Sequence, residues 1–210
     1  MDNLQPSNKT LCISQSDLIM GFLEYWGIQE CKTSNIPLQH NPNSLPPPSL
    51  NACGDIPDNK ILSSYQRLVG SLTYLTICMC PNITYTAMAL GQFNASPTRS
   101  HLACAKGVLC YLDGTVNLCL QFPLNRYQTQ LHFPLHVDFL TWTGHLMRRD
   151  CKSVSGYCFY YLGSLILWSS WKQRMVSTSS TESEYYVLTN TIKEAIWMTL
   201  FLSFTKFPSP

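Results

Sequence analysis

The stretch Ser177-Thr-Ser-Ser-Thr-Glu-Ser-Glu-Tyr-Tyr186 decides how the C-terminal half of this chain is expected to fold. Ser179, with Glu182 three positions later, has the pattern of a capping box, in which the serine oxygen accepts an unsatisfied backbone N–H at a helix start. Just before it, two runs of aromatic and aliphatic residues, 157–162 and 165–171, flank a Gly-Ser pair. This order predicts two strands joined by a tight turn and followed by a capped helix.

The helix that starts at this box is expected to hold Glu184 one turn from its N-terminus. The helix dipole favours a carboxylate there by about 0.3–1 kcal/mol without any ligand. One side of the helix shows apolar residues at helical spacing, namely Tyr185, Leu188, Ile192, Ile196 and Leu200. Tyr185 and the tryptophans could stack on nucleic-acid bases, but their helix and strand spacing favours places in the core.

Four segments upstream have the apolar spacing of helices. The first covers residues 18–26, with Gly27 as its stop and Ser16 or Asp17 as its cap. The other three are expected to form a small bundle: Ser64 to about Cys78, Pro81 to Phe93, and a segment around 102–112 that ends at Asp113-Gly114. The Pro- and Asn-rich stretch 39–62 is typical of a linker.

Two further segments alternate apolar and polar residues, as strands do. They cover 116–122 and 131–137. Pro134 cannot donate to a ladder, so it should confine the second strand to a sheet edge or a bulge. His132, His136 and Asp138 share the other face of that strand.

The composition of the 210-residue chain limits the kinds of protein to which it can belong. Apolar residues make up 45%, which allows a core, but charged residues make up only 12%, against a usual fraction of roughly 25%. The net charge of +2 is too small to indicate a nucleic-acid partner by itself. Ten cysteines without a Cys-x-x-Cys pattern predict reduced thiols. We find no signal peptide and no run of about 18 apolar residues, so we expect an intracellular chain, cytoplasmic or nuclear, not secreted and not membrane-bound.

Several motifs in order point to one family. They are Ser64-Tyr-Gln-Arg-Leu-Val-Gly-Ser-Leu-Thr-Tyr-Leu75, Ala105-Lys-Gly-Val-Leu-Cys-Tyr-Leu-Asp-Gly-Thr115, Lys152-Ser-Val-Ser-Gly-Tyr157, Trp168-Ser-Ser-Trp-Lys-Gln173 and Ser179-Ser-Thr-Glu-Ser-Glu-Tyr185. Together they resemble the Pol polyprotein of copia-type LTR retrotransposons. Ile13-Ser-Gln-Ser16 and Gly27-Ile-Gln-Glu-Cys-Lys32 are similar to the end of its reverse transcriptase. The resemblance covers nearly the whole chain apart from the linker.

The resemblance implies an incomplete ribonuclease H site. The family uses four carboxylates to hold two Mg²⁺ ions about 4 Å apart, which activate water and stabilise the leaving oxygen. Glu184 matches the family's helix glutamate, and Glu182 is assigned to helix capping. Asp138 matches the first aspartate only if one residue has been inserted before Trp142, and a one-residue slip sends a strand side chain to the other face. The third and fourth carboxylates have no counterpart, so Asp138 and Glu184 are vestigial catalytic and metal residues that could hold at most one hydrated Mg²⁺ weakly.

The resemblance also implies a nucleic-acid partner, an RNA–DNA hybrid, and makes element-encoded proteins further candidate partners. From residue 126 to residue 174 there are six basic residues and two acidic ones, a local balance of +4. The candidate phosphate contacts are Arg148, Arg149, Lys152, Lys172 and Arg174. The alternative is that these few charges form a solvated rim of the hairpin.

We therefore expect an α+β chain with a helical connection followed by a truncated ribonuclease H-like mixed sheet and one long helix. The expected domains are a reverse transcriptase remnant (1–38), the linker (39–62), the helical connection with a following strand (63–125) and the ribonuclease H-like part (126–210). The expected function is that of a degenerate Pol segment, derived from an RNA-directed DNA polymerase and ribonuclease H and inactive alone. The alternative is a non-catalytic nucleic-acid-binding or scaffold protein, which binding to a hybrid that weakens steeply with salt would favour.

Overall fold

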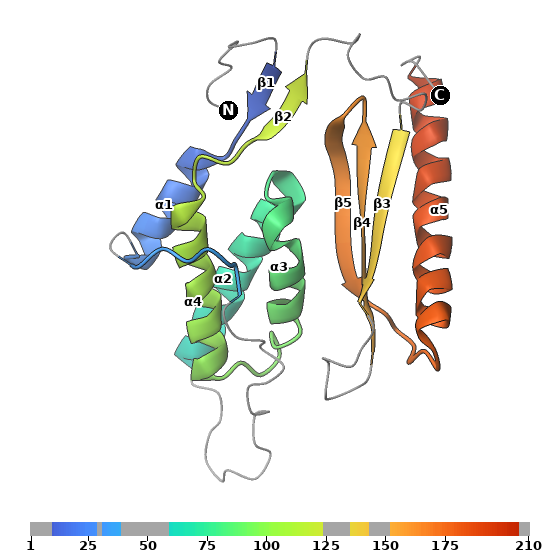
Figure 1. The fold of residues 1–210 in the computed structure, drawn as a ribbon. Coiled ribbons are helices and arrows are strands. Elements are labelled where there is room, and N and C mark those ends of the chain that lie inside the picture. The colour runs from blue at the N-terminus through green and yellow to red at the C-terminus, as the bar shows by residue number, and fades with distance from the viewer. Residues whose placement is uncertain (1–9, 29–30, 39–58, 124–134, 143–151, 206–210) are drawn as a thin grey trace. The chain divides into compact units, whose positions relative to one another are not determined.

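The computed structural model describes residues 10–28, 31–38, 59–123, 135–142 and 152–205, whose helices and strands are labelled in Figure 1. The fold is mixed helix and sheet, which confirms the α+β class. The chain divides into two compact units. The described residues within Ser14–Cys119 are here named the helical unit. Those within 120–205, together with Thr10–Ile13, are here named the sheet unit.

The helical unit begins with α1 (Ser16–Trp26), which ends as predicted at Gly27. Gly27 adopts φ 63°, a left-handed conformation that glycine enters without a Cβ penalty, and its N–H donates to the carbonyl of Glu24 at 3.0 Å. The predicted cap was wrong. Gln15 holds the cap position without a side-chain hydrogen bond, because Ser16 and Asp17 already lie inside the helix.

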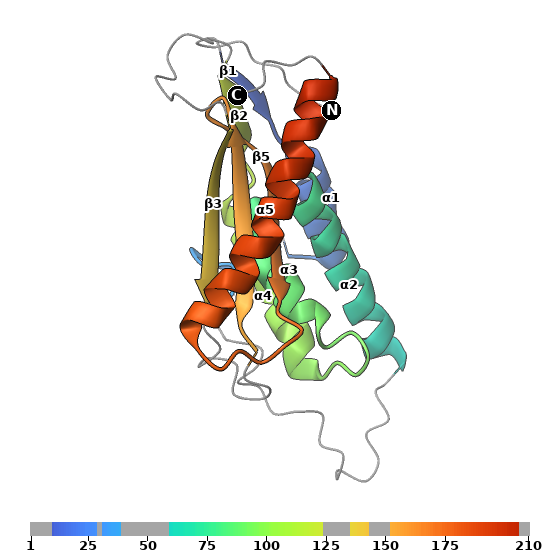
Figure 2. The same ribbon diagram turned by 90° about the vertical axis from the view of Figure 1, so that its right-hand side faces the viewer.

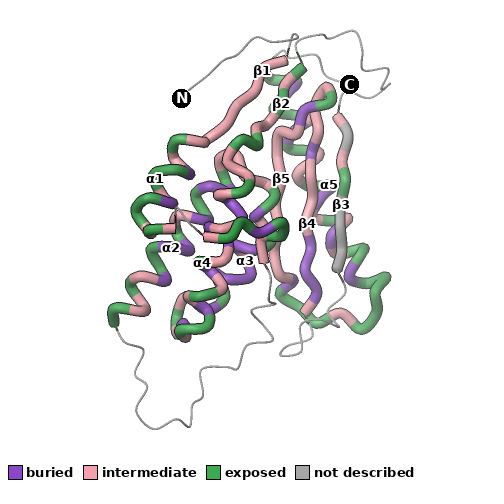
Figure 3. The backbone as a smooth tube through the Cα atoms, turned by 60° about the vertical axis from the view of Figure 1, so that its left-hand side comes forward, coloured by how far each residue is buried: buried purple, intermediate pink, exposed green. Residues whose placement is uncertain are grey.

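Three more helical segments complete this unit: α2 (Asn59–Cys78), the 3-10 turn η2 (Pro81–Ile83) that leads into α3 (Thr84–Gly91), and α4 (Arg99–Gly114). Helix α2 begins before the predicted Ser64, so the last residues of the predicted linker are helical. The rest of that linker lies outside the described residues. Figure 3 shows buried positions concentrated along α2, α3 and α4.

One apolar core holds the helical unit together. Ile19 and Leu23 of α1 join the same cluster as α2–α4, so the segments predicted as 1–38 and 63–125 share a core. The other fully buried large side chains of the cluster are Tyr65, Leu68, Val69, Leu72, Leu75, Ile83, Leu90, Val108, Leu109 and Leu112. The Tyr65 hydroxyl donates to the carbonyl of Leu90 at 2.7 Å, which satisfies the polar end of a buried ring.

The start of α4 is capped by an unusual partner. Thr98 Oγ1 accepts the His101 N–H at 3.3 Å, and the ring nitrogen Nδ1 of His101 accepts the Thr98 N–H at 3.1 Å. The imidazole is fully buried and stacks on Phe93 with 4.0 Å between ring centroids. The histidine therefore fills the place that Glu or Gln holds in an ordinary capping box.

The sheet unit contains two small antiparallel sheets. In one, β1 (Thr10–Ile13) pairs with β2 (Leu120–Pro123). Strand β2 is shorter than the predicted 116–122, because residues 115–117 form a turn after α4 and Val116 packs on the helical core. The predicted Leu131–Pro134 stretch lies outside the described residues.

The second sheet has the order β3 (Leu135–Trp142), β4 (Val154–Tyr161) and β5 (Ser164–Lys172). Within the described residues β3 is an edge strand, as predicted. The predicted hairpin is confirmed, and its turn has Leu162 at φ 50° and Gly163 at φ 79°. The β3–β4 register is continuous, whereas a shift interrupts β4–β5 between Phe159 and Tyr160.

The chain then forms α5 (Ser180–Phe204), which packs on this sheet, as Figure 2 shows. The side of α5 that is buried carries Ser183, Val187, Thr191, Met198 and Leu202. The prediction of a core position for Tyr185 was wrong, because its side chain is 66% exposed. Other apolar residues of α5 are also exposed, namely Ile192, Ile196, Trp197, Leu200, Phe201 and Phe204. Trp168 and Trp171 of β5 are half-buried. None of the described helices is long and apolar enough to cross a membrane.

Candidate carboxylate site

A buried polar network fixes the start of α5 on the end of the hairpin. Gln173, only 2% exposed, is its centre. Its Nε2 donates to Ser155 Oγ at 2.9 Å and to the carbonyl oxygen of Ser183 at 3.1 Å, and its Oε1 accepts from Ser177 Oγ at 3.1 Å. Ser153 and Ser183 hydroxyls lie 3.0 Å apart. The network ties β4, the segment after β5 and the first turn of α5 together.

One of the two hydrogen bonds of the capping box predicted for α5 is confirmed. Ser179 Oγ accepts the Glu182 N–H at 3.1 Å. The returning bond goes one residue further back than in a standard capping box, since Glu182 Oε2 accepts from the Thr178 N–H at 2.7 Å and from Thr178 Oγ1 at 2.8 Å. These hydrogen bonds to the charged form, those from Thr178 first, hold the pKa of Glu182 below its usual value. Glu182 is thus occupied with capping.

Glu184 follows directly after the network residue Ser183. Because Ser183 is 1% exposed and held by Gln173 and Ser153, the next residue points away from the sheet contact, and Glu184 is exposed. The structure therefore presents a carboxylate in the first turns of α5, where the helix N-terminus favours negative charge.

The sheet face that contacts α5 is identified by β4. Ser155 bonds to the Gln173–Ser183 network, and Phe159 is fully buried. Tyr157 lies between Ser155 and Phe159 on β4. Burial, and then the negative charge of Glu194 on α5, raise the pKa of Tyr157. Side chains alternate along a strand, so the odd-numbered positions of β4 face α5 and the even-numbered positions face away.

Asp138 lies on the sheet face that points away from α5. Its partner in the β3–β4 ladder is Cys158, and directly opposite residues of an antiparallel pair share a face. In keeping with this, burial and then the Asp138 charge raise the pKa of the Cys158 thiol. Asp138 is exposed. The structure consequently does not bring Asp138 and Glu184 together on one face.

Of the β3 side chains that the structure describes, Val137 shares the α5 face, because it pairs with the buried Phe159. The unbroken pairing from Leu135 to Trp142 leaves no bulge that would rotate Asp138 toward α5. Among the residues that the structure describes, no group of three His, Cys, Asp or Glu side chains is placed to hold a metal ion.

Comparison with known proteins places the chain among transposon proteins. It is 30% identical over 203 residues to the Retrovirus-related Pol polyprotein from transposon TNT 1-94 of Nicotiana tabacum, covering 93% of this chain and 14% of that protein. It is 38% identical over 141 residues to the Retrovirus-related Pol polyprotein from transposon RE1 of Arabidopsis thaliana, covering 67% of this chain and 9% of that protein. The chain belongs to the Pol polyproteins of copia-type retrotransposons.

A third relative matches this chain over almost its own full length. The Secreted RxLR effector protein 161 of Plasmopara viticola is 34% identical over 144 residues, covering 68% of this chain and 96% of that protein. The chain spans about one seventh of the tobacco Pol polyprotein. No family model and no solved structure matches it.

The basic residues of this Pol-family chain are only partly described. Lys152 and Lys172 are half-buried at the end of the hairpin where α5 begins, and Arg174 is exposed just beyond β5. Lys172 pairs with Val154, so it lies on the face of Asp138. Arg148 and Arg149 lie outside the described residues.

The motif comparison pointed to Glu184 but missed the residues that hold the start of its helix on the hairpin. Gln173, Ser153, Ser155 and Ser183 stand inside the Pol motifs quoted above, yet nothing there marks them as a network. A cue is present in the sequence: Ser153 and Ser155 are small polar residues at the start of an otherwise apolar strand, where a buried partner must satisfy them.

Proposed function

We propose that β3, β4, β5 and α5 form a ribonuclease H-like part of a Pol polyprotein and that α2–α4 form the helical connection before it. Three antiparallel strands in chain order, followed by a capped helix that packs on them, support the first assignment. Membership of the Pol family and the order of the motifs support both.

The second part of the proposal is that this chain does not hydrolyse an RNA strand by itself and binds no Mg²⁺ tightly. The observation behind it is the position of Asp138 on the face of the sheet opposite α5, while Glu184 lies on α5. A two-metal site needs its carboxylates to converge on ions about 4 Å apart. One exposed carboxylate on each side of a sheet cannot provide that clamp.

A hydrolysis assay tests this proposal. The purified chain is incubated with an RNA–DNA heteroduplex, labelled on the RNA strand, in the presence of Mg²⁺ or Mn²⁺. We expect no cleavage from the chain and none from Glu184→Gln. Metal-dependent cleavage that disappears in Glu184→Gln would refute the proposal, whereas cleavage that both proteins share identifies a contaminating nuclease.

Metal binding provides an independent measurement. If Asp138 and Glu184 do not share an ion, Asp138→Asn and Glu184→Gln should each leave the weak affinity for Mn²⁺ unchanged within about twofold, and their effects should be additive. Calorimetric titration of the two single variants and the double variant measures this. A strong non-additive loss would show that the two carboxylates bind one ion together.

The partner that this function implies is an RNA–DNA hybrid, with Pol proteins of the element as further candidates. Lys152, Lys172 and Arg174 gather at one end of the hairpin and offer phosphate contacts. With so few cations, binding should be weak and should fall steeply between low and physiological salt. Fluorescence anisotropy with labelled hybrid at two salt concentrations tests it, and Lys172→Ala should reduce the salt slope.

A further inference from the structure

The histidine that caps α4 also holds the preceding segment on the start of the helix. The Nδ1 atom of His101 accepts the Thr98 N–H at 3.1 Å, while Thr98 Oγ1 accepts the His101 N–H at 3.3 Å. Because a backbone N–H can only donate, Nδ1 carries no proton in this arrangement, and the proton of the neutral ring lies on Nε2. The capped geometry therefore specifies one tautomer and one charge state of the imidazole.

A second proton on the ring would remove the acceptor of this cap. The Nδ1–H and the Thr98 N–H would then be two donors facing each other across 3.1 Å. Thr98 Oγ1, 2.9 Å from Nδ1, could accept from the charged ring, but the Thr98 N–H would still lose its partner. The charge itself is costly, since the ring is fully buried and lies at the positive end of the α4 dipole.

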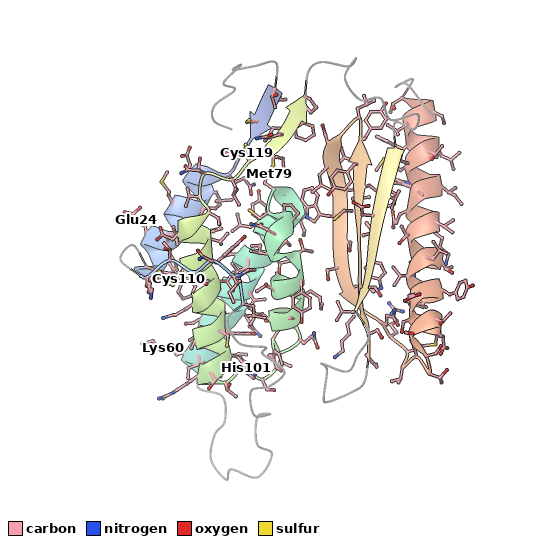
Figure 4. The ribbon with its side chains drawn as sticks, viewed as in Figure 1. Glu24, Lys60, Met79, His101, Cys110 and Cys119 are labelled. Carbon is pink, nitrogen blue, oxygen red and sulfur yellow. The ribbon has the colours of Figure 1, made fainter. Side chains whose placement is uncertain are left out.

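The described elements around the ring offer no carboxylate to stabilise a positive charge there. Helices α2 and α3, and the segment 92–98 between α3 and α4, contain no acidic residue. Asp113 lies in the last turn of α4, about 18 Å along the helix axis from His101. The acidic residues of α1 are Asp17 and Glu24, and Figure 4 shows α1, with Glu24 labelled, well away from His101.

The other titratable side chains of α2, α3 and α4 are tyrosines and cysteines, which are neutral at neutral pH. Burial raises the pKa of the Tyr65 hydroxyl on α2, of the Tyr85 hydroxyl on α3 and of the Cys104 thiol on α4, which keeps these groups neutral. The fixed charges of these helices are otherwise positive and exposed, namely Lys60, Arg67, Arg99 and Lys106. None of them favours a second positive charge on the imidazole.

We propose that His101 is a pH-sensitive latch, which holds the segment 92–98 on the start of α4 while its ring is neutral and releases that segment in mild acid. Release breaks the bond from the Thr98 N–H and frees Phe93, a buried member of the helical core that stacks on the ring with 4.0 Å between centroids. A histidine in an unfolded segment takes up a proton at about pH 6.5. The stability that the latch provides is therefore present above that pH and is lost as the pH falls below it.

Hydrogen exchange of the full chain, read by mass spectrometry, tests the latch. The N–H groups of Ser96 and Leu102 are among those that are hydrogen-bonded in the closed form. If only the released form takes up the proton, its population should rise roughly tenfold between pH 7.5 and pH 5.5. Protection of peptides that cover 92–103, corrected for the intrinsic pH dependence of exchange, should fall by the same factor.

Two variants separate the latch from an ordinary cap. Glutamine at this position of a capping box accepts the same N–H and does not titrate, so His101→Gln should stay closed and lose the tenfold change. Thr98→Val removes Oγ1 but keeps the N–H bond to Nδ1, so it should lower protection at both pH values and keep the change. An equal pH dependence in the wild type and His101→Gln overturns the proposal.

The tautomer of the wild-type ring provides a readout that depends on no variant. Long-range ¹H–¹⁵N spectra of the chain labelled with ¹⁵N-histidine, with the His101 ring assigned from its backbone resonances, should show the proton on Nε2 at neutral pH. On acidification, uptake of the second proton should coincide with the loss of protection in 92–103. A proton on Nδ1 at neutral pH, or a ring that becomes charged while the segment stays protected, also overturns the proposal.

Discussion

Gln173 should be one of the most sensitive positions of the sheet unit. Replacing it with alanine removes three side-chain hydrogen bonds, to Ser155, Ser183 and Ser177, and keeps the backbone bond from the Gln173 N–H to the Ser153 carbonyl at 2.8 Å. Two of the partners left behind, Ser155 and Ser183, are 1% exposed. At about 1 kcal/mol per bond, plus a penalty for buried groups without partners, the loss should be about 3–4 kcal/mol.

Gln173→Glu should be worse than alanine at neutral pH and should recover in acid. The introduced carboxylate would face the Ser183 carbonyl oxygen, which now accepts from Nε2 at 3.1 Å. The protonated acid can still donate there, so the folded-state pKa of the introduced carboxyl group should lie above the unfolded value of about 4.3. Stability from the protonated form is present below the unfolded pKa and is lost as pH rises through the folded pKa.

Urea unfolding measures the loss of stability, and hydrogen exchange read by mass spectrometry shows whether that loss lies in the sheet unit. Protection should fall in β4, β5 and α5 and stay unchanged in α2. Ser177→Ala, which removes one bond at a partly buried site, is the matched control and should cost only about 1 kcal/mol. The reasoning fails if Gln173→Ala costs no more than Ser177→Ala, or if the stability of Gln173→Glu is independent of pH.

Four smaller predictions concern single positions. Gly156→Ala should destabilise the hairpin by roughly 1–3 kcal/mol in urea unfolding, since its Cβ would lie 2.9 Å from the Ser169 carbonyl oxygen. Leu162→Asn should stabilise it by about 1 kcal/mol, because asparagine tolerates the φ of 50° better than leucine, and a lower midpoint would contradict this. Ile196→Lys should change the unfolding midpoint little while raising solubility, because that side chain is 56% exposed. Glu182 has a lowered pKa, so its stabilisation should be present above its unfolded pKa and lost in acid. Glu182→Gln should flatten that part of the stability profile.

The helical unit was largely predictable from sequence because its helices follow amphipathic spacing. The stripes around Leu68, Leu72 and Leu109 are buried as predicted, and the glycine stop of α1 lies at its C-terminus. The cap at Gln15 was not predictable, since a serine or aspartate within one residue of a helix start looks equally suited.

Helix α5 shows the limit of periodicity as a guide to burial. Its most apolar side, which includes Ile192 and Ile196, is exposed, while the buried side begins with Ser183 and continues through Thr191. The polar network explains this choice, because Ser183 must reach Gln173 for the buried amide to be satisfied. That requirement sets the rotation of the helix about its axis at the first turn, and this rotation fixes which side of the rest of the helix faces the sheet.

The same reasoning applies to Asp138, where one residue of register decides the chemistry. Sequence comparison alone allows Asp138 to match a ligand if an insertion is assumed, whereas the ladder pairs it with Cys158 without a bulge. In a helix, a one-residue shift rotates a side chain by about 100° and can be absorbed by tilting. In a strand the shift is a full reversal, and a two-sided sheet offers no intermediate position. Counting carboxylates is therefore an insufficient test of a metal site on a sheet. It must also be established whether each carboxylate lies on the sheet face that packs against the helix or on the opposite face.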